Sequence, residues 1–154
     1  MYATLVVFHT LAAAVWVGGT VALVFAAVPV LRRLPTRERA DAMRALGRRW
    51  KPIGWGALAV LAASGAWLAF GYWHAGDADV LFHSRPGHLL VAKAALFVAL
   101  AASSLAHDFV IGPQLNRQIR EGRPRTLMLP MRTVGWFTFA LTITLPVLGV
   151  VLTR

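Results

Sequence analysis

Four apolar stretches, each long enough to cross a bilayer as a helix, constrain the fold of this chain more than any other feature. They cover residues 5–31, 53–73, 89–111 and 133–152. A helix needs about 20 apolar residues to span the hydrocarbon core, because each residue adds only about 1.5 Å. The sequence therefore predicts an all-α protein, an integral membrane four-helix bundle whose single domain occupies residues 1–154.

The charged residues lie between these stretches and are divided unevenly among the three loops. The first loop is strongly basic, with Arg32, Arg33, Arg37, Arg39, Arg44, Arg48, Arg49 and Lys51 against Glu38 and Asp41. The last loop is basic as well, with Arg117, Arg120, Arg123, Arg125 and Arg132 against Glu121. The middle loop carries only Asp77, Asp79 and Arg85. Because basic loops stay on the cytoplasmic side, this asymmetry predicts a multi-pass protein of a bacterial-type inner membrane with both termini outside.

The basic loops also decide which partners the chain is expected to have. A formal net charge of +10 can indicate nucleic-acid binding, but these arginines flank membrane segments, where anionic lipid and water are the simpler partners. We therefore expect the lipid bilayer, and no nucleic acid, as a partner. Within the first loop, Pro35 followed by a modest apolar face at Ala42, Met43 and Leu46 predicts a short helix lying on the membrane surface.

His9 is the ionisable residue inside the first apolar stretch. At helical spacing it shares one face with Ala12, Ala13, Trp16 and Thr20. Ionisable residues at membrane depth usually face the interior of a bundle, where they bind, relay or pair. Two methyl-sized side chains beside an imidazole leave room for a flat, bulky ligand, with the indole of Trp16 against its edge.

The ends of the second and third apolar stretches provide the candidate companions of His9. His74 ends one stretch, His88 begins the next, and Lys93 lies about 8 Å deeper by helical rise. Asp77, Asp79 and His83 lie between them and are interpreted as a solvated turn. His107 lies at the other end of the third stretch beside Asp108, where we expect a local hydrogen bond and no second haem.

Haem b and copper are the two ligands that these residues suggest. Haem b needs axial nitrogens, apolar walls and a polar exit for its propionates, and Arg85 lies where propionates would emerge. His9 would supply one axial nitrogen and His74, His88 or Lys93 the other. A lysine must first lose its proton, so the two histidines are the better candidates.

Copper(I) prefers thiolate, thioether and imidazole ligands. The chain has no cysteine, and Met43, Met128 and Met131 lie toward the basic loops, so the residues favour haem over copper. The absence of cysteine also excludes disulfides and iron–sulfur clusters. Copper(II) or zinc held by His74, His83, His88 and the aspartates stays open as an alternative.

Three strings of the sequence resemble known membrane families. HTLAAAVWVGG in the first stretch, GRRWKPIGWGALAVLAASGAW at the second and KAALFVALAASSLAHDFVIGP in the third resemble copper-resistance protein D (CopD) membrane domains. The His-x6-Trp-x-Gly-Gly spacing and the lysine of the third stretch also resemble HemJ, a haem-containing protoporphyrinogen oxidase family. The resemblance implies that His9 is a haem or metal ligand and that Lys93 is its companion.

The sequence therefore predicts a membrane-embedded b-type haem protein that acts in electron transfer or an oxidoreductase step. Its expected cofactor is haem b, and its partner a quinone, a porphyrin-like substrate or a redox protein. The alternative is CopD-like copper handling or transport across the inner membrane, and a third is an accessory subunit without a cofactor. The residues leave open whether a reaction is catalysed, which side chain is the second axial ligand and whether the chain forms an oligomer.

Overall fold

The computed structural model describes residues 2–123 and 126–152, and within these ranges the chain is helical apart from short turns. The first helix runs through α1 (Tyr2–Ala22), the π-helical segment η1 (Leu23–Ala27) and α2 (Val28–Leu31), and is followed by α3 (Thr36–Gly71). After the short α4 (Ala78–His83), the third long helix comprises α5 (Arg85–Leu105), the π-helical segment η2 (Ala106–Ile111) and α6 (Gly112–Arg120). The last helix is α7 (Met128–Leu152). The all-α fold class is confirmed.

Four of these helices are long and apolar enough to cross a membrane, over residues 2–31, 36–71, 85–120 and 128–150. The second differs most from expectation, because the arginine-rich segment expected as a separate surface helix is the first part of α3. Pro52 lies inside this continuous helix. An interior proline costs roughly 3 kcal/mol, yet α3 continues through it, held by its packing against α1.

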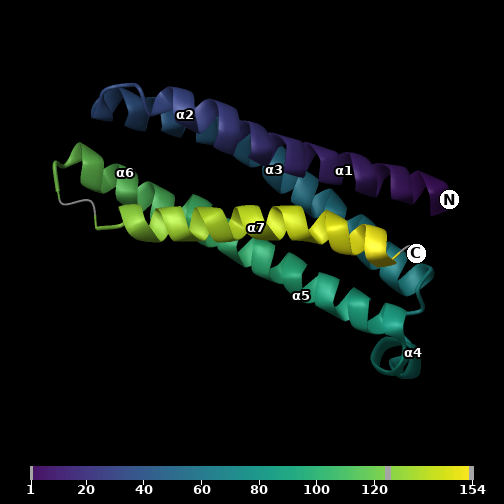
Figure 1. The fold of residues 1–154 in the computed structure, drawn as a ribbon. Helices are drawn as coiled ribbons and strands as arrows, with labels where there is room; N and C mark the ends of the chain where they lie inside the picture. Colours follow the sequence, from purple (N-terminus) through teal and green to yellow (C-terminus); the bar gives the residue numbers. More distant parts are fainter. Residues whose placement is uncertain (1, 124–125, 153–154) are drawn as a thin grey trace.

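The helices pack as two pairs (Figure 1). α1 lies along α3, and α5 lies along α7, while contacts between α1 and α7 join the pairs. Both termini and α4 lie at one end of the molecule, which we call the terminus end. α2, α6 and residues 32–35 and 121–123 lie at the other, which we call the arginine end.

Many large apolar side chains lie exposed on the outer surface of the helices. Large side chains such as Phe8, Phe25, Phe70 and Val98 are more than half exposed. The buried cluster is small and comprises Trp16, Ala57, Leu58, Leu100, Leu141 and Leu145. In lipid this arrangement is stable, since bilayer chains solvate the apolar surface and helices associate through close packing and buried polar contacts.

The two π-helical segments share a local cause. η1 ends two residues before Pro29, and η2 ends two residues before Pro113. Proline lacks the backbone N–H, and its ring clashes with the carbonyl four residues earlier. Widening the preceding turn relieves this clash, and such bulges are frequent at functional sites. The second bulge carries His107 and Asp108.

Candidate functional site

His9 lies between α1 and α3, where small residues of α3 let the imidazole approach closely. Its Nδ1 is 2.8 Å from the hydroxyl oxygen of Ser64, a residue that is only 5% exposed. A methyl group built on Gly65 would lie 3.4 Å from Cε1 of the imidazole. The residues opposite His9 on α3 are therefore small, and the hydroxyl of Ser64 holds the ring in place.

The hydrogen bonds of Ser64 favour one tautomer of His9. The serine hydroxyl donates its one proton to the carbonyl of Val60, 2.5 Å away on the preceding turn. With that proton donated to Val60, the hydroxyl accepts from His9, and we assign the imidazole proton to Nδ1 on this basis. In the neutral ring Nε2 then has a free lone pair, which is the state in which imidazole binds metals.

Lys93 of α5 joins this group from the other helix pair. It is half-buried, and its ammonium is close enough for its charge to act on His9. Its Nζ also lies 3.3 Å from where a methyl group on Gly149 of α7 would be. The structure thus brings together two residues expected at similar depth, and their roles as ligand and companion stay predictions.

The other proposed companions of His9 lie at the surface of the terminus end. His74, Arg85 and His88 are exposed, and Nε2 of His88 is 2.6 Å from the carbonyl oxygen of Phe82. His74 adopts a φ of 50° and lines a cavity of about 300 Å³ with Trp73 and other residues of the α3–α5 connection. In the described part of the chain, none of the three makes a hydrogen bond or ion pair with His9. Their ligand roles stay predictions.

Trp16, expected beside a flat ligand, is part of the buried cluster. It is 6% exposed, and its indole N–H donates to the Thr142 hydroxyl at 3.1 Å, which ties α1 to α7. The ring of Trp50 packs between Gly19 and Gly54, where a methyl on Gly19 would come within 1.9 Å of the indole. The second glycine of the VWVGG string is therefore needed for helix packing.

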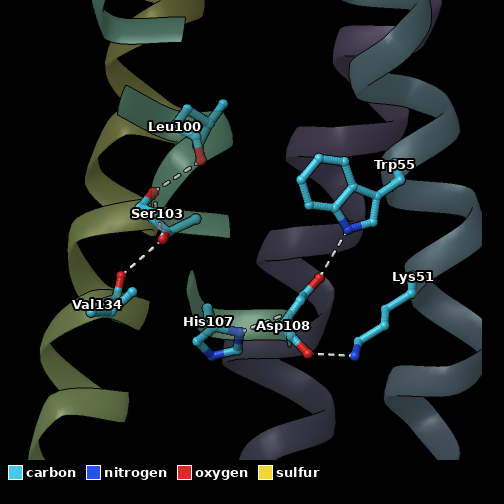
Figure 2. A network of polar contacts seen from close by, with 8 residues as sticks. Lys51, Trp55, Leu100, Ser103, His107, Asp108 and Val134 are labelled. Atoms are coloured by element: carbon cyan, nitrogen blue, oxygen red, sulfur yellow. Dashed lines mark hydrogen bonds and ion pairs between the residues drawn. The ribbon is translucent and has the colours of Figure 1, made fainter. Parts of the chain in front are cut away.

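A second polar group surrounds Asp108 at the arginine end (Figure 2). Its carboxylate accepts from Nδ1 of His107 at 3.0 Å and from the indole N–H of Trp55 at 3.2 Å. Its backbone carbonyl accepts from Nζ of Lys51 at 2.6 Å, and Lys51 lies 4.8 Å from the centre of the Phe109 ring.

The sequence predicts the local bond of His107 but not the two α3 partners. The sequence places Lys51 among the charges of the first loop and does not indicate that Trp55 contacts Asp108. The available signal was Asp108 itself, since a carboxylate inside an apolar stretch needs partners from neighbouring helices.

The donors available for a metal are few. Within the described residues, no group of three or more His, Asp or Glu side chains is placed to hold a metal ion. At the terminus end, Asp79 and His83 approach to 3.4 Å, but their side chains are 93% and 77% exposed. Among the described residues, a metal ion between the helices could therefore bind to single imidazoles. The clusters of carboxylates that typically hold a tightly bound cation are not present among these residues.

Four long apolar helices with polar groups between them define an integral membrane protein. Residues 43–152 match the family described as copper resistance protein D, and the chain belongs to this CopD family. The comparisons do not show the resemblance to HemJ. No curated protein and no solved structure matches the chain. The family match includes Lys93 and His107, while His9 precedes it.

Proposed function

We propose that the protein handles copper in the membrane, taking copper(I) as cargo on Nε2 of His9 and passing it between the two sides. The family match supports a role linked to copper. The observation that carries the proposal is the hydrogen bond from His9 to Ser64, because it leaves a lone pair on Nε2 at membrane depth.

The donor set favours copper(I) over copper(II). Copper(II) prefers a tetragonal set of nitrogen and oxygen ligands, whereas copper(I) is soft and accepts imidazole and thioether in small number. The described residues hold no cluster of the first kind. A single imidazole beside small residues suits a monovalent ion that stops briefly and moves on.

Lys93 gives the site a means of release. A protonated ammonium near the imidazole repels a cation bound there, and we expect this repulsion to weaken binding about tenfold, or by about 1.4 kcal/mol. Such a site binds weakly, which suits transported cargo better than a resident cofactor.

Haem b has less support than copper. The family match points to copper, and the two cavities described, of about 300 and 560 Å³, are not lined by His9. The expected second imidazoles are exposed, and His88 is bonded to Phe82. For orientation we retain the charge asymmetry, which favours the arginine end in the cytoplasm of a bacterial-type inner membrane.

The test compares His9→Ala with Thr10→Val in cells and in detergent. Thr10 is the exposed neighbour of His9, and its hydroxyl donates to the carbonyl of Val6. We expect His9→Ala to abolish protein-dependent copper accumulation and Thr10→Val to leave it unchanged. Equal accumulation in both variants would contradict the proposal, and so would a Soret band, at one haem per chain, that His9→Ala removes.

A further inference from the structure

A second histidine at the arginine end has the same arrangement as His9. The carboxylate of Asp108 can only accept, so Nδ1 of His107 carries a proton, and in the neutral ring Nε2 has a lone pair. A methyl built on Gly135 of α7 would lie 3.8 Å from that Nε2. The donor nitrogen therefore faces α7 at a position where the facing residue has no side chain.

A thioether lies one turn away on the same face of α7. Met131 precedes Gly135 by four residues, so both present the same side of the helix. Met131 is half-buried, and its terminal methyl lies 3.8 Å from where a methyl on Gly112 would be. Gly112 directly follows η2, so the sulfur side chain and the imidazole both lie in the contact between α7 and this π-helical segment.

We propose that Nε2 of His107 and the sulfur of Met131 form a binding site for a soft monovalent metal ion, of which copper(I) is the biological example. Imidazole and thioether are both ligands that copper(I) accepts. The methionine side chain has three rotatable bonds, so its sulfur can rotate toward the imidazole. Because Gly135 has no side chain, the space between the sulfur and Nε2 is not filled by that residue.

The surroundings of His107 favour a bound cation. Asp108 orients the imidazole through the Nδ1 bond, as carboxylate partners of metal-ligating histidines commonly do. Trp55 holds the other carboxylate oxygen and Lys51 the backbone carbonyl, so the orienting group is itself fixed from α3. The π-helical turn places His107 and Asp108 together at this contact.

The site extends the proposed copper function but does not depend on His9. The two histidines lie at opposite ends of the helices, so each can be tested in the absence of the other. In transport, this second site would hold the ion at the arginine end after it leaves His9.

The test uses silver(I), a redox-stable soft monovalent ion, added to protein labelled with ¹³C in its methionine methyl groups. Met128 is the matched control, since it lies three residues earlier on α7 and is 39% exposed. One equivalent of silver should shift the Met131 signal and leave Met128 in place. Met131→Leu and His107→Gln should each weaken silver binding at least tenfold, whereas Met128→Leu should not.

Three results would overturn this site: an unmoved Met131 signal, equal shifts of Met131 and Met128, or equal silver affinity of Met131→Leu and Met128→Leu. The Met131 shift should persist in His9→Ala. If His9→Ala keeps copper accumulation while Met131 still shifts, the His9 proposal fails and this one stands.

Discussion

The two histidine sites share one arrangement and differ in the group that orients the ring. In both, Nδ1 is held by an oxygen acceptor and Nε2 is left with a lone pair. The acceptor of His9 is the neutral hydroxyl of Ser64, and the cation Lys93 lies nearby. The acceptor of His107 is a carboxylate that is itself held from α3. From this difference we expect the same donor atom, Nε2 of histidine, to bind a metal ion weakly at His9 and more tightly at His107. The charges near the two rings differ: a cation lies near His9, and a carboxylate holds His107.

Removing the orienting acceptors should break the two sites unequally. Asp108→Ala leaves two partly buried donors, those of His107 and Trp55, without their acceptor, whereas Ser64→Ala removes the acceptor of one donor, that of His9. With each lost partner costing roughly 1 kcal/mol or more, we expect Asp108→Ala to lower the free energy of unfolding by about 2–3 kcal/mol and Ser64→Ala by about 1 kcal/mol.

Reversible unfolding in detergent measures both values. Asp79→Ala is the control, since that carboxylate is 93% exposed and should change stability little. Equal losses in Asp108→Ala and Ser64→Ala would show that the carboxylate network is no stronger than the single serine bond.

Removing the cation near His9 should make the two sites more alike. Lys93→Met keeps the length of the side chain but removes the charge that opposes a bound ion. We expect copper(I) to bind His9 about tenfold more tightly, a change of about 1.4 kcal/mol, and to be released more slowly. Competition with a copper(I) chelator measures the affinity, with the exposed Arg85→Gln as control. Unchanged or weaker binding in Lys93→Met would show that Lys93 supports the ion or lies too far to affect it.

The sequence predicts the helices well because hydropathy depends only on local composition. It also brings His9 and Lys93 to similar depth, since helical rise converts residue number into depth. The sequence does not predict that α3 continues through Pro52. A proline often ends a helix, but inside a helix that is held by its neighbours it only removes one backbone hydrogen bond and adds a local clash.

The partners of the two histidines were harder to predict. Ser64 belongs to a run of small residues, and only the rotation of α3 about its axis decides that its hydroxyl faces His9. The contact between Met131 and the turn after His107 depends in the same way on how α7 packs against η2. Sequence spacing determines which residues share a face of one helix, but not which face of another helix they meet.

Nitrogen NMR of the His9 side chain tests the central claim most directly. In ¹⁵N-histidine-labelled protein, with His9→Gln used to assign the signal, we expect a neutral ring protonated on Nδ1 and donating to Ser64. Addition of silver(I) as a stand-in for copper(I) should then shift Nε2 and leave the proton on Nδ1. A ring protonated on Nε2, or an Nε2 signal that stays unmoved at silver concentrations that saturate the protein, would contradict the account.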